Sequence, residues 1–431
     1  MDVHDVNTKF RRLGWKRLTI CLIVEAIALG SLSIPSVFAT IGLVPGIIVS
    51  IGIGFIAIYT SHVIGQVKLK HRHIDHYADA VGLMFGKVGY EITSVMFVLL
   101  LVLIVGSHVL TGTIALVSII KNMSICALAW TVISAIILFV VALPPTFAEF
   151  AILGYIDFGS IICAIMITII ATGVRASHAD GGFSAVDWHA FPQGDVSCAS
   201  AFLAVTNIVF AYSFAVCQFS FMSEMHTPED YPKSIWALGL IEIFIYTGTG
   251  ALVYVFVGSD VASPALLSAG PVISRVAFGV AVPVIFISGS INTTVVSQYI
   301  IRRTIKNPKI RDIECVKGWA IWIGLCAVVT VIAWIVAEAI PFFNALLGLI
   351  SSLFISGFTF YFPALMWFIL IKQGAWYERK NLGLSLLNFA IFIIGVIILV
   401  CGVYASVVDI KNGYSSGSVR GSFTCSAEAY T

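Results

Sequence analysis

Long apolar segments constrain this sequence more than any other feature. About eleven of them follow one another, each close to the roughly 20 residues that a helix needs to cross a bilayer. Charged residues make up only 11% of the 431-residue chain, against about 25% in a soluble domain. The sequence therefore predicts an all-α polytopic membrane protein. The predicted spans are 18–39, 44–65, 92–119, 125–142, 147–171, 199–222, 235–257, 271–299, 318–339, 342–370 and 383–405.

The polar stretches between these spans are too short to form a separate soluble domain. We therefore expect one membrane domain at 18–408, preceded by an N-terminal tail at 1–17. The C-terminal tail, 409–431, is rich in Gly, Ser and Tyr and is predicted to be disordered. Within the membrane domain, helices one to five occupy about 18–171, helices six to ten about 199–370, and helix eleven about 383–405.

Lysine and arginine residues are distributed unevenly between the two sides of the predicted bundle. If the N-terminus is cytosolic and the spans alternate, 19 of the 24 Lys and Arg residues fall on the cytosolic side. Short cytosolic loops carry such an excess in membrane proteins. We therefore expect a cytosolic N-terminus and, with eleven spans, a C-terminus outside. The five remaining basic residues are Lys121, Arg175, Arg275, Lys411 and Arg420.

The cysteines and the charge pattern argue against several kinds of site. The nine cysteines include no C-x-x-C pair, so a metal or redox site is not expected. Cys126 lies in an apolar run, whereas Cys198 and Cys425 lie outside such runs, and nothing in the pattern requires them to pair. No basic run with interleaved aromatic residues indicates a nucleic-acid partner. We expect no bound cofactor and no obligate protein partner, and the surroundings are the lipid bilayer.

The first and sixth spans contain features that would interrupt a helix in mid-membrane. The first carries the run Gly30–Pro35, and proline, glycine and serine all disfavour a helix interior. This run predicts either a plain proline kink or a true break, at which freed backbone groups must bond to protein, water or ligand. The sixth span has Phe210–Phe214 at the corresponding place; it contains no Pro or Gly and, taken alone, would stay helical.

Interrupted helices at the start of each half of a five-plus-five inverted repeat point to the central site of a transporter. Amides at a half-helix N-terminus suit a carboxylate, and carbonyls at a C-terminus suit an ammonium group. A zwitterionic amino acid carries both charges and would bridge the two kinds of helix end. The predicted substrate-binding residues are Ala28, Gly30, Ser31 and Ser33 in the first span and Ala211, Tyr212, Ser213 and Phe214 in the sixth.

Three stretches resemble the amino acid/auxin permease family, and fungal neutral amino acid permeases most closely. They are the Gly30–Pro35 run followed by Phe38, the Phe210-Ala211-Tyr212 sequence, and the Glu224–Lys233 segment (Glu-Met-His-Thr-Pro-Glu-Asp-Tyr-Pro-Lys). The sequence departs from the family pattern where Ala28, Ser213 and Phe214 replace glycines.

The resemblance covers nearly the whole chain, from Gly14 to the eleventh span. It implies the leucine-transporter-type fold with eleven spans and broken helices one and six. It also implies uptake of neutral amino acids by alternating access, with protons as the coupling ion. Some members of the family use sodium or lie on vacuoles.

Ionisable residues inside spans are costly and usually functional. Glu25, five residues before Gly30, is the first candidate for proton coupling, because a desolvated carboxylate can take up a proton near neutral pH. Asp157 in the fifth span is the second, and Glu242 and His108 follow. The alternative interpretation of these residues is that they pack between helices and form hydrogen bonds there, without a role in coupling.

A polar run in the eighth span has two interpretations. Its hydroxyl groups would complete a sodium site together with carbonyls of helix one, or they would bond neighbouring helices around Gly289. The residues of the candidate sodium site are Ser290, Thr293 and Thr294.

The leading prediction is a secondary active transporter that imports neutral aliphatic or aromatic amino acids by proton symport. A channel would need charge rings or filter loops, and a receptor would normally have seven spans. An enzyme would need a clustered nucleophile and base or a metal set. The cluster His71–Asp79 lies in a basic, membrane-facing loop, so no enzymatic activity is expected.

Within transporters, several alternatives remain open. They are a vacuolar amino acid exporter, a sodium-coupled carrier and a carrier of another substrate, such as a polyamine or an auxin-like compound. By family analogy we expect the plasma membrane, with the vacuolar membrane as the alternative.

Overall fold

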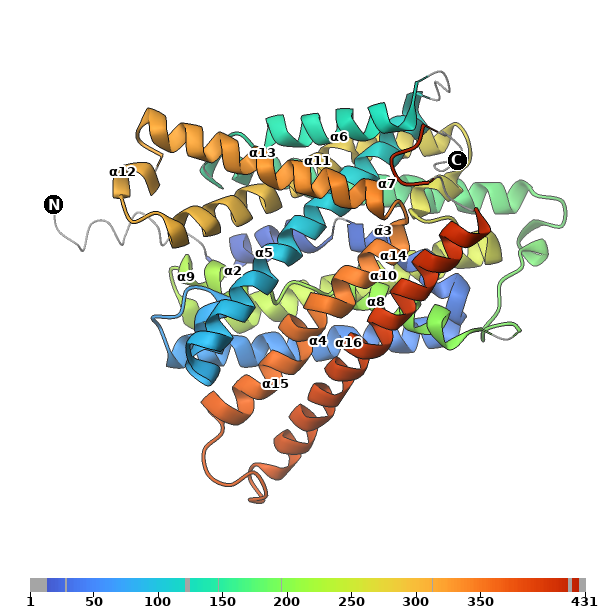
Figure 1. The fold of residues 1–431 in the computed structure, drawn as a ribbon. Helices are drawn as coiled ribbons and strands as arrows, with labels where there is room; N and C mark the ends of the chain where they lie inside the picture. Colours follow the sequence, from blue (N-terminus) through green and yellow to red (C-terminus); the bar gives the residue numbers. More distant parts are fainter. Residues whose placement is uncertain are drawn as a thin grey trace.

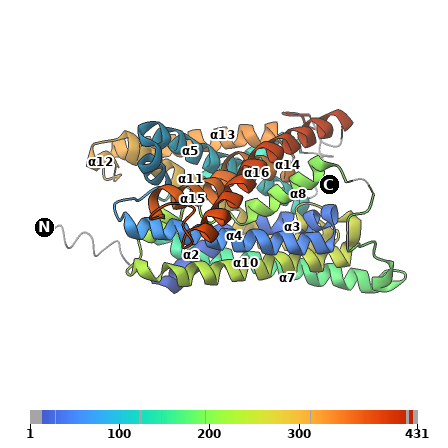
Figure 2. The ribbon, with the colours of Figure 1, turned by 90° about the horizontal axis from the view of Figure 1, so that it is seen from below.

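Long helices run side by side through the molecule, with loops and short helices at its two ends (Figure 1, Figure 2). The structure, a computed structural model, describes residues 14–27, 29–120, 125–145, 147–194, 196–311, 313–417 and 421–425, without the side chains of 21, 24, 25 and 147–153. Helices make up the regular structure throughout these ranges, and no strand occurs in them. The predicted all-α fold is confirmed.

The described residues contain a helix for each of the eleven predicted spans. In the described ranges, eight helical segments are long and apolar enough to cross a membrane, and three shorter apolar helices complete the set. The eight are α4 (Leu43–Lys70), α5 (Tyr77–Ile120), α7 (Phe147–His178), α10 (Tyr231–Val257), α11 (Ile273–Thr304), α13 (Val316–Ala339), the segment Phe343–Ile371 and α16 (Leu382–Ser416). The three are α3 (Leu29–Ile41), α6 (Ala127–Val141) and α8 (Cys198–Ala211).

Spans one and six are both broken, which confirms the prediction of two interrupted helices. Span one consists of α2 (Trp15–Ala26) followed by α3, and span six consists of α8 followed by α9 (Gln218–Ser223). The position of the first break differs from the one expected. The Gly30–Pro35 run is helical and lies within α3, with Pro35 inside the helix, and the chain leaves the helix at Ile27 instead.

The spans pack in two groups joined by α7. In one group, α10 packs against α2, α3 and α4, and α3 packs against α8. In the other, α11 and α5 pack against each other and against α6 and α13. The first group thus combines spans one and two with six and seven, and the second combines three and four with eight and nine. This is the arrangement that an inverted repeat of five spans produces.

Span ten is the least regular. It reads α14 (Phe343–Ile350), η5 (Ser351–Tyr361), α15 (Phe362–Met366) and η6 (Trp367–Ile371), and both η segments are π-helical. The last span, α16, runs obliquely to α6 and α13 (Figure 1) and packs on α8, α14 and η5. Short helices in the loops are η1 (Gly182–Ala185), η2 (Pro228–Asp230), η3 (Gly258–Asp260), η4 (Ala265–Ala269) and α12 (Pro308–Arg311).

The helices of spans two and three, α4 and α5, extend beyond the predicted apolar segments. α4 continues to Lys70, past the predicted end at residue 65, and α5 begins at Tyr77 rather than near residue 92. Gly86, at φ 66° and ψ −156°, separates a short first helix from the membrane span within α5. Hydropathy detects only the apolar part of a helix, so it predicts a loop for the polar turns that extend beyond the membrane.

The composition of the C-terminal tail predicts disorder from residue 409, but the structure is helical beyond that point. α16 continues to Ser416, and Cys425 forms a disulfide with Cys126, which directly precedes α6. The ring of Phe423 packs edge-on against Trp334 of α13, with centroids 5.8 Å apart. The tail therefore crosses the ends of spans four and nine. The two cysteines are 299 residues apart in sequence, so their spacing gave no sign of the pairing.

The disulfide predicts a specific cross-linked pair of peptides. The Cα atoms of Cys126 and Cys425 are 4.6 Å apart, within the range that a disulfide requires. We expect a peptide containing Cys126 to be linked to one containing Cys425 in the unreduced protein, and the two to separate on reduction. Mass spectrometry of digests alkylated under denaturing conditions measures this. Cys198, which is free, serves as the control, and recovery of alkylated Cys126 without reduction would contradict the pairing.

Candidate functional site

The two broken helices touch each other at their breaks. A Cβ atom built on Gly30 would lie 2.7 Å from the Cα atom and 2.9 Å from the Cβ atom of Ala211. Gly30 is the second residue of α3, and Ala211 is the last residue of α8. The glycine is therefore required for the close approach of α3 to the end of α8, and the backbone at Gly30 itself remains helical.

One phenol connects both breaks. The Oη atom of Tyr246, a buried residue of α10, lies 2.9 Å from the carbonyl oxygen of Ala26 and 3.2 Å from that of Ala211. These carbonyls belong to the last residues of α2 and α8, where a helix leaves its final carbonyls without backbone partners. Tyr246 thus satisfies freed backbone groups from both broken spans. Sequence reasoning missed this residue, because one tyrosine within an apolar span carries no local signal.

Tyr212, the first residue after α8, turns towards spans two and seven. Its Oη atom lies 3.3 Å from Oγ of Ser50, to which Thr247 donates at 3.2 Å. Its ring packs edge-on against Tyr246, with centroids 5.1 Å apart. Helices α4 and α10 therefore hold the start of the second break, and this explains how span six is interrupted without a proline or glycine.

A small cavity lies beside the breaks. The space open to the centre of a water-sized sphere is about 40 Å³, which is enough for a few water molecules. It lies between the group of spans one and six and the group of spans three and eight. The lining residues are Ala26, Leu29, Gly30, Leu101, Ile104, His108, Phe210, Ser213, Val216 and Asn292.

The predicted substrate residues are brought together only in part. Gly30 and Ser213 line the cavity, and Ala211 lies directly behind Gly30. Ser33 donates to the carbonyl oxygen of Gly30 at 2.9 Å, inside α3. Ser31 and Phe214 are buried but are not part of the lining. Ala28 and the side chain of Glu25 lie outside the described residues.

The candidate sodium residues of span eight are engaged mainly within their own helix. Ser290 donates to the carbonyl of Ile287 at 2.8 Å, and Thr293 donates to that of Gly289 at 3.0 Å. Thr294 is buried, and its hydroxyl finds no partner in the described part of the chain. The residue of this helix that reaches the cavity is Asn292, whose amide also donates to the carbonyl of Ser288 at 2.9 Å.

The buried ionisable residues have different surroundings. Asp157 of α7 accepts a hydrogen bond from Ser288 of α11 at 3.0 Å, which links spans five and eight. His108 of α5 lies at the cavity and is hydrogen-bonded through Nδ1 to the carbonyl of Ile285 at 2.8 Å. Glu242 of α10 is completely buried, and neither of its oxygens has a hydrogen-bond partner among the described residues.

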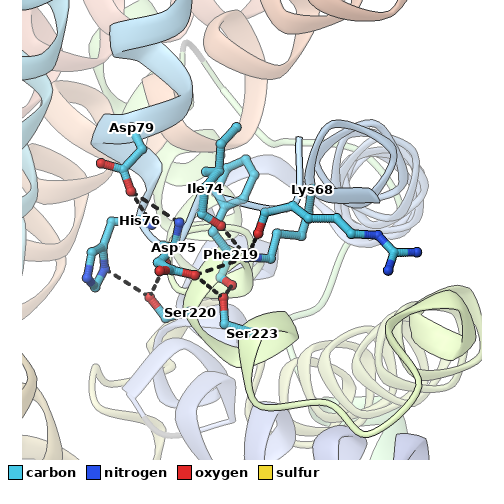
Figure 3. A network of polar contacts seen from close by, with 9 residues as sticks. Lys68, Ile74, Asp75, His76, Asp79, Phe219, Ser220 and Ser223 are labelled. Carbon is cyan, nitrogen blue, oxygen red and sulfur yellow. Dashed lines mark hydrogen bonds and ion pairs between the residues drawn. The ribbon is translucent and has the colours of Figure 1, made fainter. Parts of the chain in front are cut away.

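A polar network joins α9, the second half of span six, to the loop between spans two and three (Figure 3). Lys68 at the end of α4 is almost completely buried and donates to Asp75 at 3.1 Å and to the carbonyl of Ile74. Ser223 donates to the Asp75 carboxylate at 2.8 Å, and Ser220 donates to the Asp75 carbonyl at 3.1 Å. We call this set the α9 network.

The surroundings of Asp75 in the α9 network favour its ionised form. Burial opposes ionisation of Asp75, but hydrogen bonds from Ser223 and Lys68 outweigh it and lower the pKa of the carboxyl. Burial also lowers the pKa of His76, against the opposing effect of the Asp79 and Asp75 carboxylates. Asp75 is therefore a carboxylate at neutral pH and remains the acceptor that anchors α9.

The Glu224–Lys233 segment anchors the start of α10. Tyr231 is buried, donates to the carbonyl of His62 at 3.0 Å and stacks on the His62 ring. Gly65 makes room for the Tyr231 ring, since a Cβ atom there would come within 2.0 Å of it. Glu229 forms an exposed ion pair with Arg72 at 3.0 Å. The Glu224–Lys233 segment therefore holds the loop between spans six and seven against α4.

Comparisons with known proteins agree with this architecture. Residues 11–408 match the family described as transmembrane amino acid transporter protein. The N amino acid transport system protein of Neurospora crassa is 60% identical over 425 residues, covering 98% of this chain and 90% of that protein. A transmembrane transporter of Gibberella moniliformis is 30% identical over 428 residues, covering 97% and 88%.

Solved structures show the same fold. Mhp1, a nucleobase-cation-symport-1 family transporter, matches in a closed conformation with bromovinylhydantoin bound, with a TM-score of 0.56, 14% identity and coverage of 95% of this chain and 94% of Mhp1. The inward-facing conformation of Mhp1 matches with a TM-score of 0.56, 16% identity and coverage of 94% and 92%. The predicted leucine-transporter-type fold is thereby confirmed.

The contact at Gly30 predicts that a single added methyl group destabilises the protein. In Gly30→Ala the new Cβ atom meets the backbone of Ala211, which cannot move without shifting α8. We expect a loss of about 1–3 kcal/mol in unfolding free energy, measured by thermal unfolding in detergent. Gly52→Ala on α4, where a Cβ atom meets nothing within 4 Å, should not lower stability, because alanine is the better helix former. Equal melting temperatures for the two variants would contradict the close contact.

The bridge made by Tyr246 predicts faster local opening when its hydroxyl is removed. Tyr246→Phe removes the single hydroxyl hydrogen that the carbonyls of Ala26 and Ala211 share, a cost of about 1–3 kcal/mol. We expect at least about fivefold faster hydrogen exchange in peptides that cover the two breaks. Tyr254→Phe, a buried phenol of the same helix bonded to His189, should leave these peptides unaffected. Unchanged exchange in Tyr246→Phe would show that the phenol does not hold the breaks.

Proposed function

The chain belongs to the transmembrane amino acid transporter family, and we propose that it imports neutral amino acids together with protons. The observation that carries this proposal is the contact between the two breaks beside a cavity. It brings the start of α3, the end of α8 and the end of α2 together at one place.

The helix ends supply groups for both charges of an amino acid. The first amides of a helix have no acceptor within that helix, and those of α3, from Leu29 onward, lie at the positive end of the helix dipole, so they suit the carboxylate. The last carbonyls of α8 and α2 suit the ammonium group. Tyr246 donates to the carbonyls of Ala26 and Ala211, and a carbonyl oxygen can accept a second hydrogen bond.

The cavity favours a neutral side chain. Its lining is apolar apart from His108, Ser213 and Asn292. None of the described lining residues is Asp, Glu, Lys or Arg, so a charged substrate side chain would be buried there without a partner, at high cost. Aliphatic and aromatic side chains gain from contact with residues such as Leu101, Ile104 and Phe210.

Two independent features support a cytosolic N-terminus and a C-terminus outside. The Lys and Arg residues are concentrated at the end of the bundle that holds Lys68, Arg72 and α12. The Cys126–Cys425 disulfide lies at the opposite end, and disulfides persist on the oxidising, non-cytosolic side of a membrane. This orientation suits import at the plasma membrane. A vacuolar exporter, whose lumenal side corresponds to the outside, is the alternative.

Protons are the proposed coupling ion, and sodium is the alternative. The protein buries acids within its spans, and such residues form proton relays in pumps and transporters. Sodium coupling would have to use Ser290, Thr293 and Thr294. The first two already donate to carbonyls of α11, although their oxygens retain lone pairs for a cation.

Uptake into proteoliposomes tests the proposal. With the purified protein, we expect labelled leucine or phenylalanine to accumulate when the outside is acidified relative to the inside, because the proton gradient drives symport. Unlabelled neutral amino acids should compete, and lysine and glutamate should not. A sodium gradient at equal pH is the matched control and should drive no accumulation. Accumulation that follows sodium and ignores pH would overturn proton coupling, and the absence of any amino acid uptake would overturn the function itself.

A further inference from the structure

Glu242 is the acidic side chain that stands out among the described residues of the spans. It is completely buried in α10, neither carboxyl oxygen has a hydrogen-bond partner in the described ranges, and it forms no ion pair there. The other buried acids differ. Asp157 accepts a hydrogen bond from Ser288, and Glu338 accepts one from Thr131 of α6. An ionised carboxylate without a partner is strongly disfavoured in such a place, so Glu242 holds a proton in this conformation.

Tyr246 follows Glu242 by four residues, on the same face of α10. The ring of Tyr246 in turn packs edge-on against that of Tyr212, so Glu242 shares its helix face with the phenol that holds both breaks. Of the titratable groups on the helices packed against α10, Tyr59 of α4 bonds Asn388, His62 of α4 contacts Tyr231, and Asp157 of α7 faces α11. The cations of these helices lie at helix ends: Lys16 and Arg17 in the first turn of α2, Lys68 and Lys70 in the last turn of α4, and Arg175 in the last turn of α7. The described part of the chain therefore brings no cation to Glu242.

We propose that Glu242 is the residue that binds and releases the coupling proton, an inference that rests on the proposed proton symport. When the site opens to the outside, water reaches the carboxylate, which takes a proton from hydronium and leaves water. The neutral acid can then be buried as the site closes. When the site opens to the cytosol, the acid returns the proton to water and becomes a carboxylate again.

The position of Glu242 explains how the proton affects the helix breaks. A carboxylate one helical turn from the Tyr246 phenol attracts its hydrogen more strongly than a carbonyl does. Ionisation of Glu242 therefore competes with the bonds from Tyr246 to the carbonyls of Ala26 and Ala211. Protonation leaves these bonds intact, which favours the closed arrangement of α2, α3 and α8. The proton and the amino acid thus act on the same helix ends.

The test uses the full-length protein in proteoliposomes, with Glu242→Gln as the variant that mimics the protonated acid. We expect uptake driven by a pH gradient to fall at least about tenfold. Exchange of labelled for unlabelled leucine without a gradient should stay within about twofold of the wild type and become independent of pH, because the closed state is preserved. Glu338→Gln, a buried acid on α13 far along the chain from the breaks, is the matched control and should keep gradient-driven uptake.

Several outcomes would overturn the inference. Gradient-driven uptake by Glu242→Gln equal to the wild type is one, and loss of pH dependence in Asp157→Asn but not in Glu242→Gln is another. If Glu242→Gln does not reach the membrane folded, Glu242→Asp decides: its pH profile should shift relative to the wild type, and an unchanged profile overturns the role. If the wild type itself ignores the pH gradient, proton symport fails first, and this is visible without any variant.

Discussion

The structure depends on how backbone groups freed in the middle of a membrane find partners. Lipid offers none, so a helix can be interrupted there only where protein, water or substrate bonds the exposed amides and carbonyls. Here α10 contributes to both interruptions: Tyr246 reaches the carbonyls of Ala26 and Ala211, and Thr247 donates to Ser50 of α4, which bonds Tyr212. Because one helix serves both breaks, spans one, six and seven are coupled, and a change at α10 reaches both halves of the repeat.

The sequence predicted the architecture better than the details of the site. Eleven apolar segments and the concentration of basic residues on one side follow from hydropathy and charge, whereas the interruption of span six follows only from the family resemblance; the structure contains all of them. Local propensity misplaced the first break, because Gly30 serves the close contact with Ala211 and Pro35 is accommodated within α3. It also missed what depends on residues distant in sequence: the phenol of Tyr246 and the pairing of Cys126 with Cys425. Each of these is set by tertiary contacts that no local pattern records.

The two ends of the bundle are closed by different kinds of contact. At the α9 end, Lys68, Asp75, Ser220 and Ser223 connect span six to the loop that leads into span three. At the Cys126 end, the loop before span six pairs with the start of α4, where the amides of Leu43 and Val44 donate to the carbonyls of His189 and Ala190 at 3.1 and 2.9 Å. Both sets bridge parts that belong to different spans, so each would have to open when the site is exposed at its own end.

The energies of these contacts are compatible with control by a bound substrate. Each hydrogen bond contributes about 0.5–1.5 kcal/mol net, so the few bonds at either end together hold it closed by a few kcal/mol. Moving a two-state equilibrium from 1:99 to 99:1 requires about 5.5 kcal/mol, a similar amount. A zwitterion that bonds the ends of α3 and α8 can supply a difference of this size between two conformations. The hydrogen bonds named at the two ends are of a size that such a small ligand can offset, which fits alternating access.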